Sequence, residues 1–204
     1  MNKKEEPSYV SAYELLRNQI LNGEIKPETK LTETMLAKKL NLSRTPIRSA
    51  MTQLKNEGFI KNKHVHVPSE KEIRDVFQVR VILEGYAAKY CANVISEEAL
   101  QHLEQCVATA QKGSKDEILQ ANYEFHQVLV EETHNQEVIK IIDQMQTMIF
   151  LMRQTVTLHQ RVHLIDEHEN ILNAIKNNDG PLAERLLQEH LNKDLEFTMN
   201  RLKK

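Results

Sequence analysis

Two arginines one helical turn apart are the residues of this chain with the clearest chemistry. Arg44 and Arg48 stand in the run SRTPIR, residues 43–48, and a spacing of four puts both side chains on one face of a helix. A guanidinium group can bind a guanine edge or a phosphate through two hydrogen bonds, and a helix N-terminus attracts phosphate. The run therefore predicts a recognition helix for the major groove of DNA, with Ser43 and Thr45 adding contacts. The alternative is a pair of surface arginines that form ion pairs within their own helix.

Two histidines are spaced so that they can lie side by side, and a third histidine is paired with an asparagine on another helix. His168 and His190 each lie eleven residues from Asp179, in the middle of a predicted turn. Eleven residues is close to three helical turns, so the two imidazoles stand at the same height in an antiparallel helix pair. Asn122 and His126, four residues apart on another helix, can complete a nitrogen and oxygen donor set for a divalent metal ion, with zinc favoured over nickel or manganese. The alternative for each histidine by itself is a core or solvated residue that a neighbour satisfies.

The arginines belong to a pattern of two short helices joined by a tight turn, over residues 31–60. Thr32 suits the N-cap of the first helix, Asn41 the positive φ of the turn, and Ser43 the N-cap of the second helix. Gly58 ends the second helix. Apolar residues three and four apart form the inward face of the pair: Leu36, Ala37, Leu40, Ile47, Ala50, Met51 and Leu54.

A further helix and a β-hairpin flank this motif. The helix is expected over residues 8–22, and Gly23 ends it. Residues 59–60 and 64–67 are predicted as two short strands, which makes the hairpin the wing of a winged helix-turn-helix domain. The tip of the hairpin contains no glycine, so its entry into the minor groove is in question, although Lys63 can still reach a phosphate.

Everything after Ser69 is predicted to be helical, and the short turns between the helices make neighbours antiparallel. The predicted fold is therefore mainly α, with a winged helix-turn-helix domain over residues 1–68 and an antiparallel all-α bundle over residues 69–204. The expected bundle helices cover residues 70–93, 96–112, 114–133 and 136–158, then one helix to 177 and one from 180 that closes the chain.

The charge is divided unevenly between these two parts. Residues 1–68 carry a net charge of +5 and residues 69–204 a net charge of −7, which together give the −2 of the whole chain. A basic N-terminal part followed by an acidic C-terminal part suits a nucleic-acid binder, because neutralising phosphate supplies most of the non-specific affinity for nucleic acid. An excess of this size also arises by chance, so it only supports the motif.

The composition excludes several classes of protein. There is no run of about 18 apolar residues, so no membrane span is expected, and the N-terminus lacks the apolar core of a signal peptide. The two cysteines, Cys91 and Cys106, fall within helical patterns. They are predicted to be buried small side chains without a disulfide, in a protein of the reducing cytoplasm.

From Leu31 to Gly58 the sequence resembles the DNA-binding domain of GntR-family transcriptional regulators. The shared pattern consists of spaced leucines, Glu33, the run SRTPIR and the final Glu57-Gly58. This resemblance implies a homodimer that binds a palindromic operator in double-stranded DNA.

The rest of the chain resembles the FCD subfamily of these regulators. The run VRVILEGYAA, residues 79–88, is similar to its signature, and the segments that contain Asn122, His126, His168 and His190 are similar to its metal-site segments. Asn122 stands where many members have aspartate, and a dication gains less from an amide oxygen than from a carboxylate.

The resemblance also implies a small organic acid as effector, bound in a metal-containing pocket of the bundle. It places Arg80 in the wall of this pocket, where the guanidinium can bind a carboxylate. The alternative for Arg80 is an ion pair with Glu84, four residues on. His163 is expected to support the pocket.

The sequence thus predicts a ligand-responsive transcriptional regulator and not an enzyme. The regulator is expected to be a repressor. One alternative is a metal-dependent hydrolytic enzyme, for which Glu167 is the only candidate base. The other is a purely structural metal site with no effector.

Overall fold

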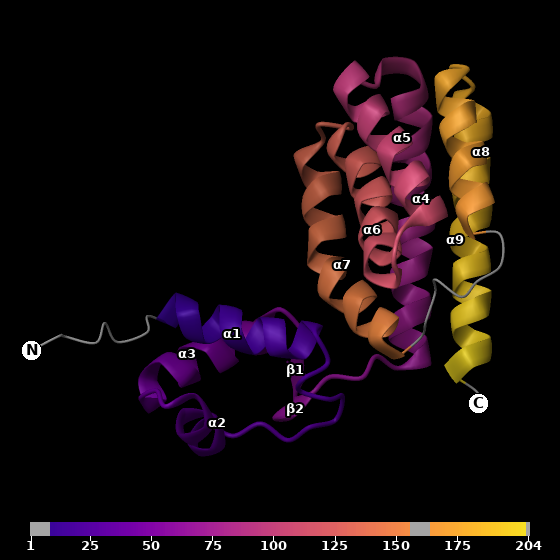
Figure 1. Cartoon of the computed structure of the whole chain (residues 1–204). Coiled ribbons are helices and arrows are strands. Elements are labelled where there is room, and N and C mark those ends of the chain that lie inside the picture. Colours follow the sequence, from indigo (N-terminus) through magenta and orange to yellow (C-terminus); the bar gives the residue numbers. More distant parts are fainter. Residues whose placement is uncertain (1–8, 156–163, 203–204) are drawn as a thin grey trace, which may run out of the picture. The chain divides into compact units, whose positions relative to one another are not determined.

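The computed structural model describes residues 9–155 and 164–202, which form two compact units. The first contains residues 9–69 and 146–155, and the second contains residues 70–145 and 164–202. The described residues form nine helices and one two-stranded sheet (Figure 1), which confirms the predicted, mainly α fold class. Among them, no helix is both long and apolar enough to span a membrane.

The first unit is built from three helices, a hairpin and the helical residues 146–155. Its elements are α1 (Tyr9–Leu21), α2 (Glu33–Leu40), α3 (Arg44–Asn56), β1 (Ile60–Lys61) and β2 (His64–Val65).

The hairpin pairs Ile60 with Val65 in antiparallel register. The predicted second strand, 64–67, was too long, because the regular ladder ends at Val65. Beyond it, the His66 amide donates to the Phe59 carbonyl at 2.8 Å. The chain before α2 covers the open edge of β2, where the Val65 amide donates to the Thr29 carbonyl.

The tip of the hairpin accommodates the absence of glycine through two residues with positive φ. Asn62 has a φ of 51° and Lys63 a φ of 63°. A two-residue loop with both residues in this region matches the twist of the two strands. Asparagine adopts such a φ readily, whereas lysine does so at a cost of about 1–2 kcal/mol. The chain therefore makes the tight turn with a lysine side chain at its tip.

Most of the predicted helix ends in this unit are confirmed. The Thr32 hydroxyl accepts a hydrogen bond from the Met35 amide at 3.3 Å. Asn41, with a φ of 53°, closes α2 in the left-handed conformation. Gly23 and Gly58 follow α1 and α3 with positive φ of 72° and 86°.

One predicted cap is wrong. Ser43 occupies the N-cap position of α3 with an extended backbone, but its side chain makes no capping hydrogen bond. A capping hydroxyl commonly binds the amide three residues on, and that residue here is Pro46, which has no N–H. The proline that favours the start of the helix thus removes one donor on which the cap depends.

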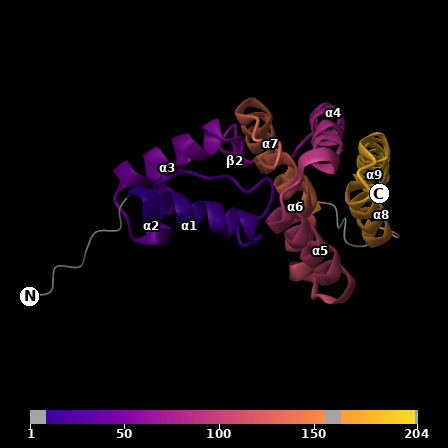
Figure 2. The ribbon, with the colours of Figure 1, turned by 90° about the horizontal axis from the view of Figure 1, so that it is seen from above.

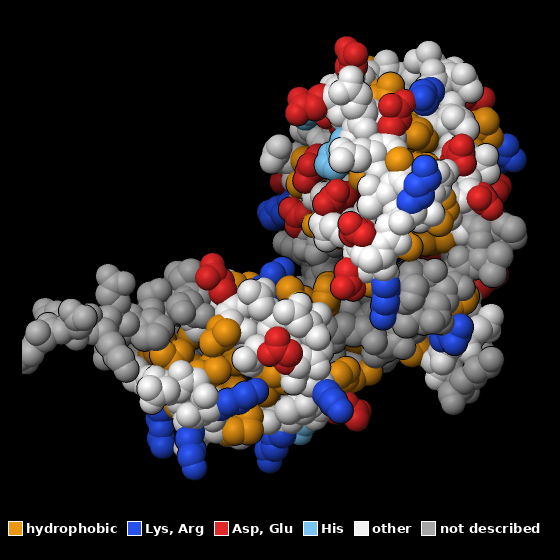
Figure 3. Space-filling view, in the orientation of Figure 1, with side chains coloured by type: hydrophobic (Ala, Val, Ile, Leu, Met, Phe, Trp, Pro, Cys, Tyr) orange, Lys and Arg blue, Asp and Glu red, His pale blue; other side chains and the backbone are white. Residues whose placement is uncertain are grey.

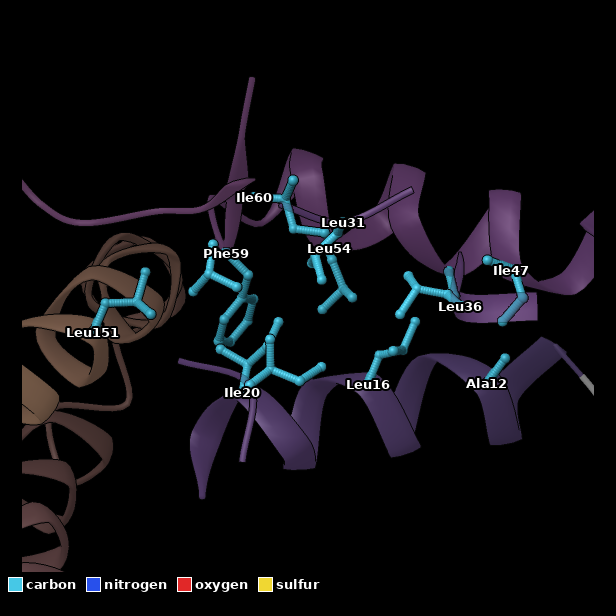
Figure 4. Close-up of a cluster of buried hydrophobic side chains, with 13 residues drawn as sticks. Ala12, Leu16, Ile20, Leu31, Leu36, Ile47, Leu54, Phe59, Ile60 and Leu151 are labelled. Carbon is cyan, nitrogen blue, oxygen red and sulfur yellow. The ribbon is translucent and has the colours of Figure 1, made fainter. Parts of the chain in front are cut away.

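Buried apolar side chains from every element of the first unit meet in one cluster (Figure 4). This core holds one face of α3 against α1 and the hairpin, so the opposite face of α3 is left to solvent. The cluster consists of Ala12, Leu16, Ile20, Ile25, Leu31, Leu36, Ile47, Ala50, Leu54, Phe59, Ile60, Val65 and Leu151.

The second unit is a bundle in which α4 packs against α9, α5 against α6, and α8 against α9. The helices run side by side in two views (Figures 1 and 2). They are α4 (Glu70–Val94), α5 (Glu97–Lys112), α6 (Lys115–Glu131), α7 (Gln136–Thr155), α8 (Leu164–Lys176) and α9 (Gly180–Leu202). Of α7, residues 136–145 belong to this unit and residues 146–155 to the first unit.

The predicted end of α7 at residue 158 and the predicted start of the next helix lie outside the described residues, as does His163.

Gly85 of α4 lies close to α9. A Cβ added at Gly85 would lie 2.9 Å from the Cγ atom of Gln188, so the Gln188 side chain would have to move. A sharp turn joins α8 to α9, with Asn178 at a φ of 56° and the Asp179 carboxylate accepting from the Leu182 amide at 3.0 Å. The turn makes α8 and α9 antiparallel neighbours, as the histidine spacing requires.

Candidate functional site

The residues predicted to contact DNA all lie on the surface of the first unit. Ser43, Arg44, Thr45 and Arg48 are exposed around the N-terminal half of α3, and Lys63 is exposed at the hairpin tip. Figure 3 shows lysine and arginine side chains along the edge of this unit where α2 and the hairpin lie. This placement leaves the five side chains accessible, and their contact with DNA remains a prediction.

One of these residues has a partner that the sequence did not reveal. Arg48 forms an ion pair with Glu33 of α2, with 3.1 Å between Nε and Oε1. The predicted alternative, an ion pair within α3 itself, is therefore wrong for Arg48, since its partner belongs to the other helix of the motif.

The bundle brings three of the predicted metal ligands together. One ring nitrogen from each of His126, His168 and His190 lies within 4.8 Å of the other two. All three residues are buried, with exposed fractions of 6%, 2% and 0%. Phe125 stacks on His168, with ring centroids 4.2 Å apart and planes 8° from parallel. The packing therefore fixes the position of the cluster.

Two buried polar atoms at this cluster have no hydrogen-bond partner. They are Nε2 of His126 and Oδ1 of Asn122, and Asn122 stands one helical turn before His126 on α6. A buried polar group without a partner is unfavourable, and in native proteins it commonly marks a missing ion or water. Both atoms have a lone pair to offer, so both suit a cation.

Neighbouring carboxylates lie against Nδ1 of two of the rings. Nδ1 of His126 lies 2.7 Å from Oε2 of Glu84, and Nδ1 of His190 lies 2.9 Å from Oε2 of Glu167. A carboxylate only accepts, which assigns the proton of His126 to Nδ1 and leaves a lone pair on its unpartnered Nε2. Carboxylates behind metal-bound histidines commonly act in this way.

Glu84 also binds Arg80. This is the ion pair that the sequence offered as the alternative to an effector contact for Arg80. The guanidinium donates to Glu84 from Nε at 2.6 Å and from Nη2 at 3.3 Å. Both side chains are 2% exposed. Burial by itself would raise the pKa of Glu84, but Arg80 and His126 outweigh it and hold that pKa at about 2. Burial lowers the pKa of His126 to about 4 against the pull of Glu84, so at neutral pH the ring is neutral and able to ligate.

Two further carboxylates, those of Glu167 and Asp194, lie beside His190. Glu167, the candidate catalytic base, accepts from His190 and from Nζ of Lys193 at 2.9 Å. Asp194 was missed altogether: it is 2% exposed, and its Oδ2 atom lies 3.6 Å from Nε2 of His190. Its spacing of four from His190 was the available signal, because that spacing puts both side chains on one face of α9.

One distance in the cluster fits a first-row divalent metal ion. Nε2 of His168 and Nε2 of His190 are 3.3 Å apart. Two nitrogen ligands at the usual zinc distance of about 2.0–2.1 Å, in tetrahedral geometry, are also roughly 3.3 Å apart. The donor set, this distance and the unpartnered atoms of Asn122 and His126 therefore all suit such an ion.

A second group of possible ligands lies at the surface between α5 and α6. His102, Cys106 and Glu124 have ligand atoms within 4.8 Å of one another. Burial and the charge of Glu124 raise the pKa of Cys106 to about 11, so its thiol is protonated at neutral pH. Cys91 and Cys106 are both buried and free, as predicted.

A winged helix-turn-helix unit joined to a helical bundle with a buried histidine cluster is the organisation of a transcriptional regulator. The model of the gntR family of bacterial regulatory proteins matches residues 8–66, and the model of the FCD domain matches residues 75–193. The chain belongs to the GntR family, in the group of regulators that carry an FCD domain.

Curated relatives match along nearly the whole chain. The uncharacterized HTH-type transcriptional regulator YdhC of Bacillus subtilis is 29% identical over 95% of this chain and 92% of its own length. The transcriptional repressor RspR of Escherichia coli is 25% identical over 91% and 86%. The gluconate operon transcriptional repressor of Bacillus subtilis is 27% identical over 88% and 79%. These relatives are regulators and not enzymes, which removes the hydrolase alternative.

Solved structures show the same fold. E. coli McbR/YncC superimposes with a TM-score of 0.72 at 18% identity, covering 95% of this chain and 98% of that one. The metal-free FCD domain of TM0439 gives a TM-score of 0.59 at 20% identity, covering 68% of this chain and 99% of that domain.

Proposed function

We propose that this DNA-binding regulator is a repressor that binds a palindromic operator as a homodimer. Arg44 and Arg48 contact base edges or phosphates in the major groove, the backbone near Ser43 and Thr45 contacts phosphate, and Lys63 contacts phosphate from the hairpin tip. Two copies of the first unit reach successive major grooves, as two-fold symmetric helix-turn-helix dimers do. RspR and the gluconate operon protein are both repressors by name, which supports repression rather than activation.

In this proposal the helical bundle controls DNA binding through a metal ion and an effector. His126, His168 and His190, with Asn122, hold a divalent metal ion, which is zinc by its donor set or else nickel or manganese. The ion presents positive charge to a small carboxylate effector, and the effector shifts the dimer between two arrangements by binding one of them better. The observation that carries this proposal is the convergence of three buried imidazoles beside the unpartnered Nε2 of His126.

One observation favours a second candidate, a structural metal site without an effector. Arg80, which the family resemblance assigns to the effector, has two nitrogens engaged by Glu84 inside the bundle. The ion would then stabilise the fold and the regulator would respond to the metal alone.

The test begins with metal analysis of the purified protein and of two variants. His190→Ala removes a proposed ligand, and His134→Asn is its control, because His134 is exposed with a φ of 50° that asparagine also adopts. A ligand present at 100 times its Kd stabilises by about 2.7 kcal/mol. Zinc is expected to raise the Tm of the wild type and of His134→Asn but not of His190→Ala, and equal rises in all three would refute the site.

The second step separates the two candidates. A panel of small carboxylates is added to the zinc-loaded protein bound to its operator, and release of DNA is measured. Release by a carboxylate from the wild type, but not from His190→Ala, supports the effector. A Tm that responds to zinc while DNA binding responds to no carboxylate favours the structural site.

A further inference from the structure

Arg48 is held by a carboxylate from the other helix of the helix-turn-helix. Glu33, in the first turn of α2, accepts from Nε of Arg48 at 3.1 and 3.2 Å and from Nη2 at 3.1 Å. The side chains are 68% and 36% exposed for Arg48 and Glu33, and an exposed ion pair contributes little to folding stability. Folding stability therefore does not by itself account for the three hydrogen bonds between Arg48 and Glu33.

The geometry of the pair leaves one edge of the guanidinium for another partner. Nε and Nη2 form its side-on edge, which Glu33 occupies. The end-on edge consists of Nη1 and the second hydrogen of Nη2, and Nη1 takes no part in these hydrogen bonds. Two parallel donors of this kind match the O6 and N7 acceptors of guanine in the major groove.

Glu33 also restricts the motion of Arg48. A long arginine side chain loses rotamer freedom when it binds, and that loss weakens the contact. A side chain already held by a carboxylate has lost part of this freedom before DNA arrives. The backbone at Glu33 is fixed, because α2 begins at this residue and Thr32 caps the helix.

We propose that Glu33 is a positioning residue that sets Arg48 for end-on binding of one guanine in each half of the operator. The inference rests on the proposed function. Glu33 also places a negative charge on the surface that faces DNA, so it weakens sequence-independent binding to phosphate. Specificity is the difference between the affinity for the operator and the affinity for unrelated DNA. Glu33 increases this difference because it strengthens the first affinity and weakens the second.

The test first selects an operator from randomised duplex DNA with the wild-type protein. Wild type, Glu33→Gln, Arg48→Ala and the double variant are then titrated with that operator, with operators in which single G·C pairs are replaced, and with scrambled DNA over a range of salt. Glu24→Gln is the matched control, because Glu24 is exposed in the same unit and its change removes the same charge.

The expected result has three parts. Wild type and Glu24→Gln lose at least about fivefold in affinity when one particular G·C pair in a half-site is replaced. Glu33→Gln loses that preference and binds scrambled DNA more tightly, with a salt slope steeper by up to about 0.9 because the released arginine neutralises a phosphate. In the Arg48→Ala background, Glu33→Gln changes no base preference.

Other outcomes overturn the proposal. A Glu33→Gln protein that keeps the wild-type preference at every position shows that Glu33 does not position Arg48, and a lowered Tm with unchanged preference shows a structural role instead. A wild-type protein that selects no operator refutes the proposed function itself, and so the two failures are distinguishable.

Discussion

Replacing Glu84 by alanine is expected to destabilise the helical bundle strongly. The side chains of Glu84 and Arg80 are each 2% exposed, and Glu84 accepts hydrogen bonds from Arg80 and from His126. Without the carboxylate, the Arg80 guanidinium stays charged in a site that excludes water. Removing one partner of a buried pair costs about 3–5 kcal/mol, which corresponds to a Tm lower by roughly 6–20 °C for a chain of this size.

The measurement is thermal unfolding of the metal-free protein, followed by circular dichroism. Glu184→Ala is the matched control, because Glu184 also accepts from a cation of α4, Nζ of Lys89 at 2.8 Å, but with side chains 31% and 50% exposed. The loss of an exposed pair is expected to cost about 0–1 kcal/mol.

A double variant isolates the cause of the loss. Replacing Arg80 and Glu84 together by leucine or methionine removes both charges, so most of the stability is expected to return. The reasoning is refuted if Glu84→Ala loses no more stability than Glu184→Ala. It is also refuted if the double variant is no more stable than Glu84→Ala, because an isolated buried charge would then not be the cause.

Three further outcomes are expected. Lys63→Gly relieves the left-handed backbone at the hairpin tip, so it should stabilise the first unit to denaturant by up to about 1 kcal/mol. The same variant should lower the salt slope of DNA binding by about 0.9, and a destabilised hairpin would contradict the assigned turn. Ser114→Ala removes the capping box with Glu117 at the start of α6 and should cost about 0.5–2 kcal/mol in unfolding free energy, whereas an unchanged value would contradict the cap. Burial raises the pKa of Cys91 to about 12 and that of Cys106 to about 11, so at pH 8 both are protonated thiols. A thiol reagent should label them only after denaturation, and rapid labelling of the folded protein would show that they are accessible.

Much of the fold of the first unit could be predicted because its signals are local. Thr32, Asn41 and the glycines after α1 and α3 act within a few residues of their own position, through capping hydrogen bonds or positive φ. The wrong cap at Ser43 was also a local matter. Pro46 removes the donor three residues on, and the sequence contained that information.

The histidine cluster was only partly within reach of the sequence. The equal spacing of His168 and His190 from Asp179 predicted a shared height in the α8–α9 hairpin, and their Nε2 atoms lie 3.3 Å apart. The position of His126 beside them depends on how α6 packs in the bundle, which helical periodicity does not determine. Family resemblance, rather than spacing, was what linked it to the other two.

The sequence by itself determined which residues form helices, where most helices end, and which helix faces carry arginines or histidines. Only the tertiary structure decided which carboxylate each of these side chains meets. Glu84 joins His126 across 42 residues of sequence, Glu167 joins His190 across 23, and Glu33 joins Arg48 across 15. A hydrogen bond between side chains forms only within a few tenths of an ångström of its preferred distance. Periodicity fixes the face of a helix, whereas the depth and register at which two helices pack set that distance.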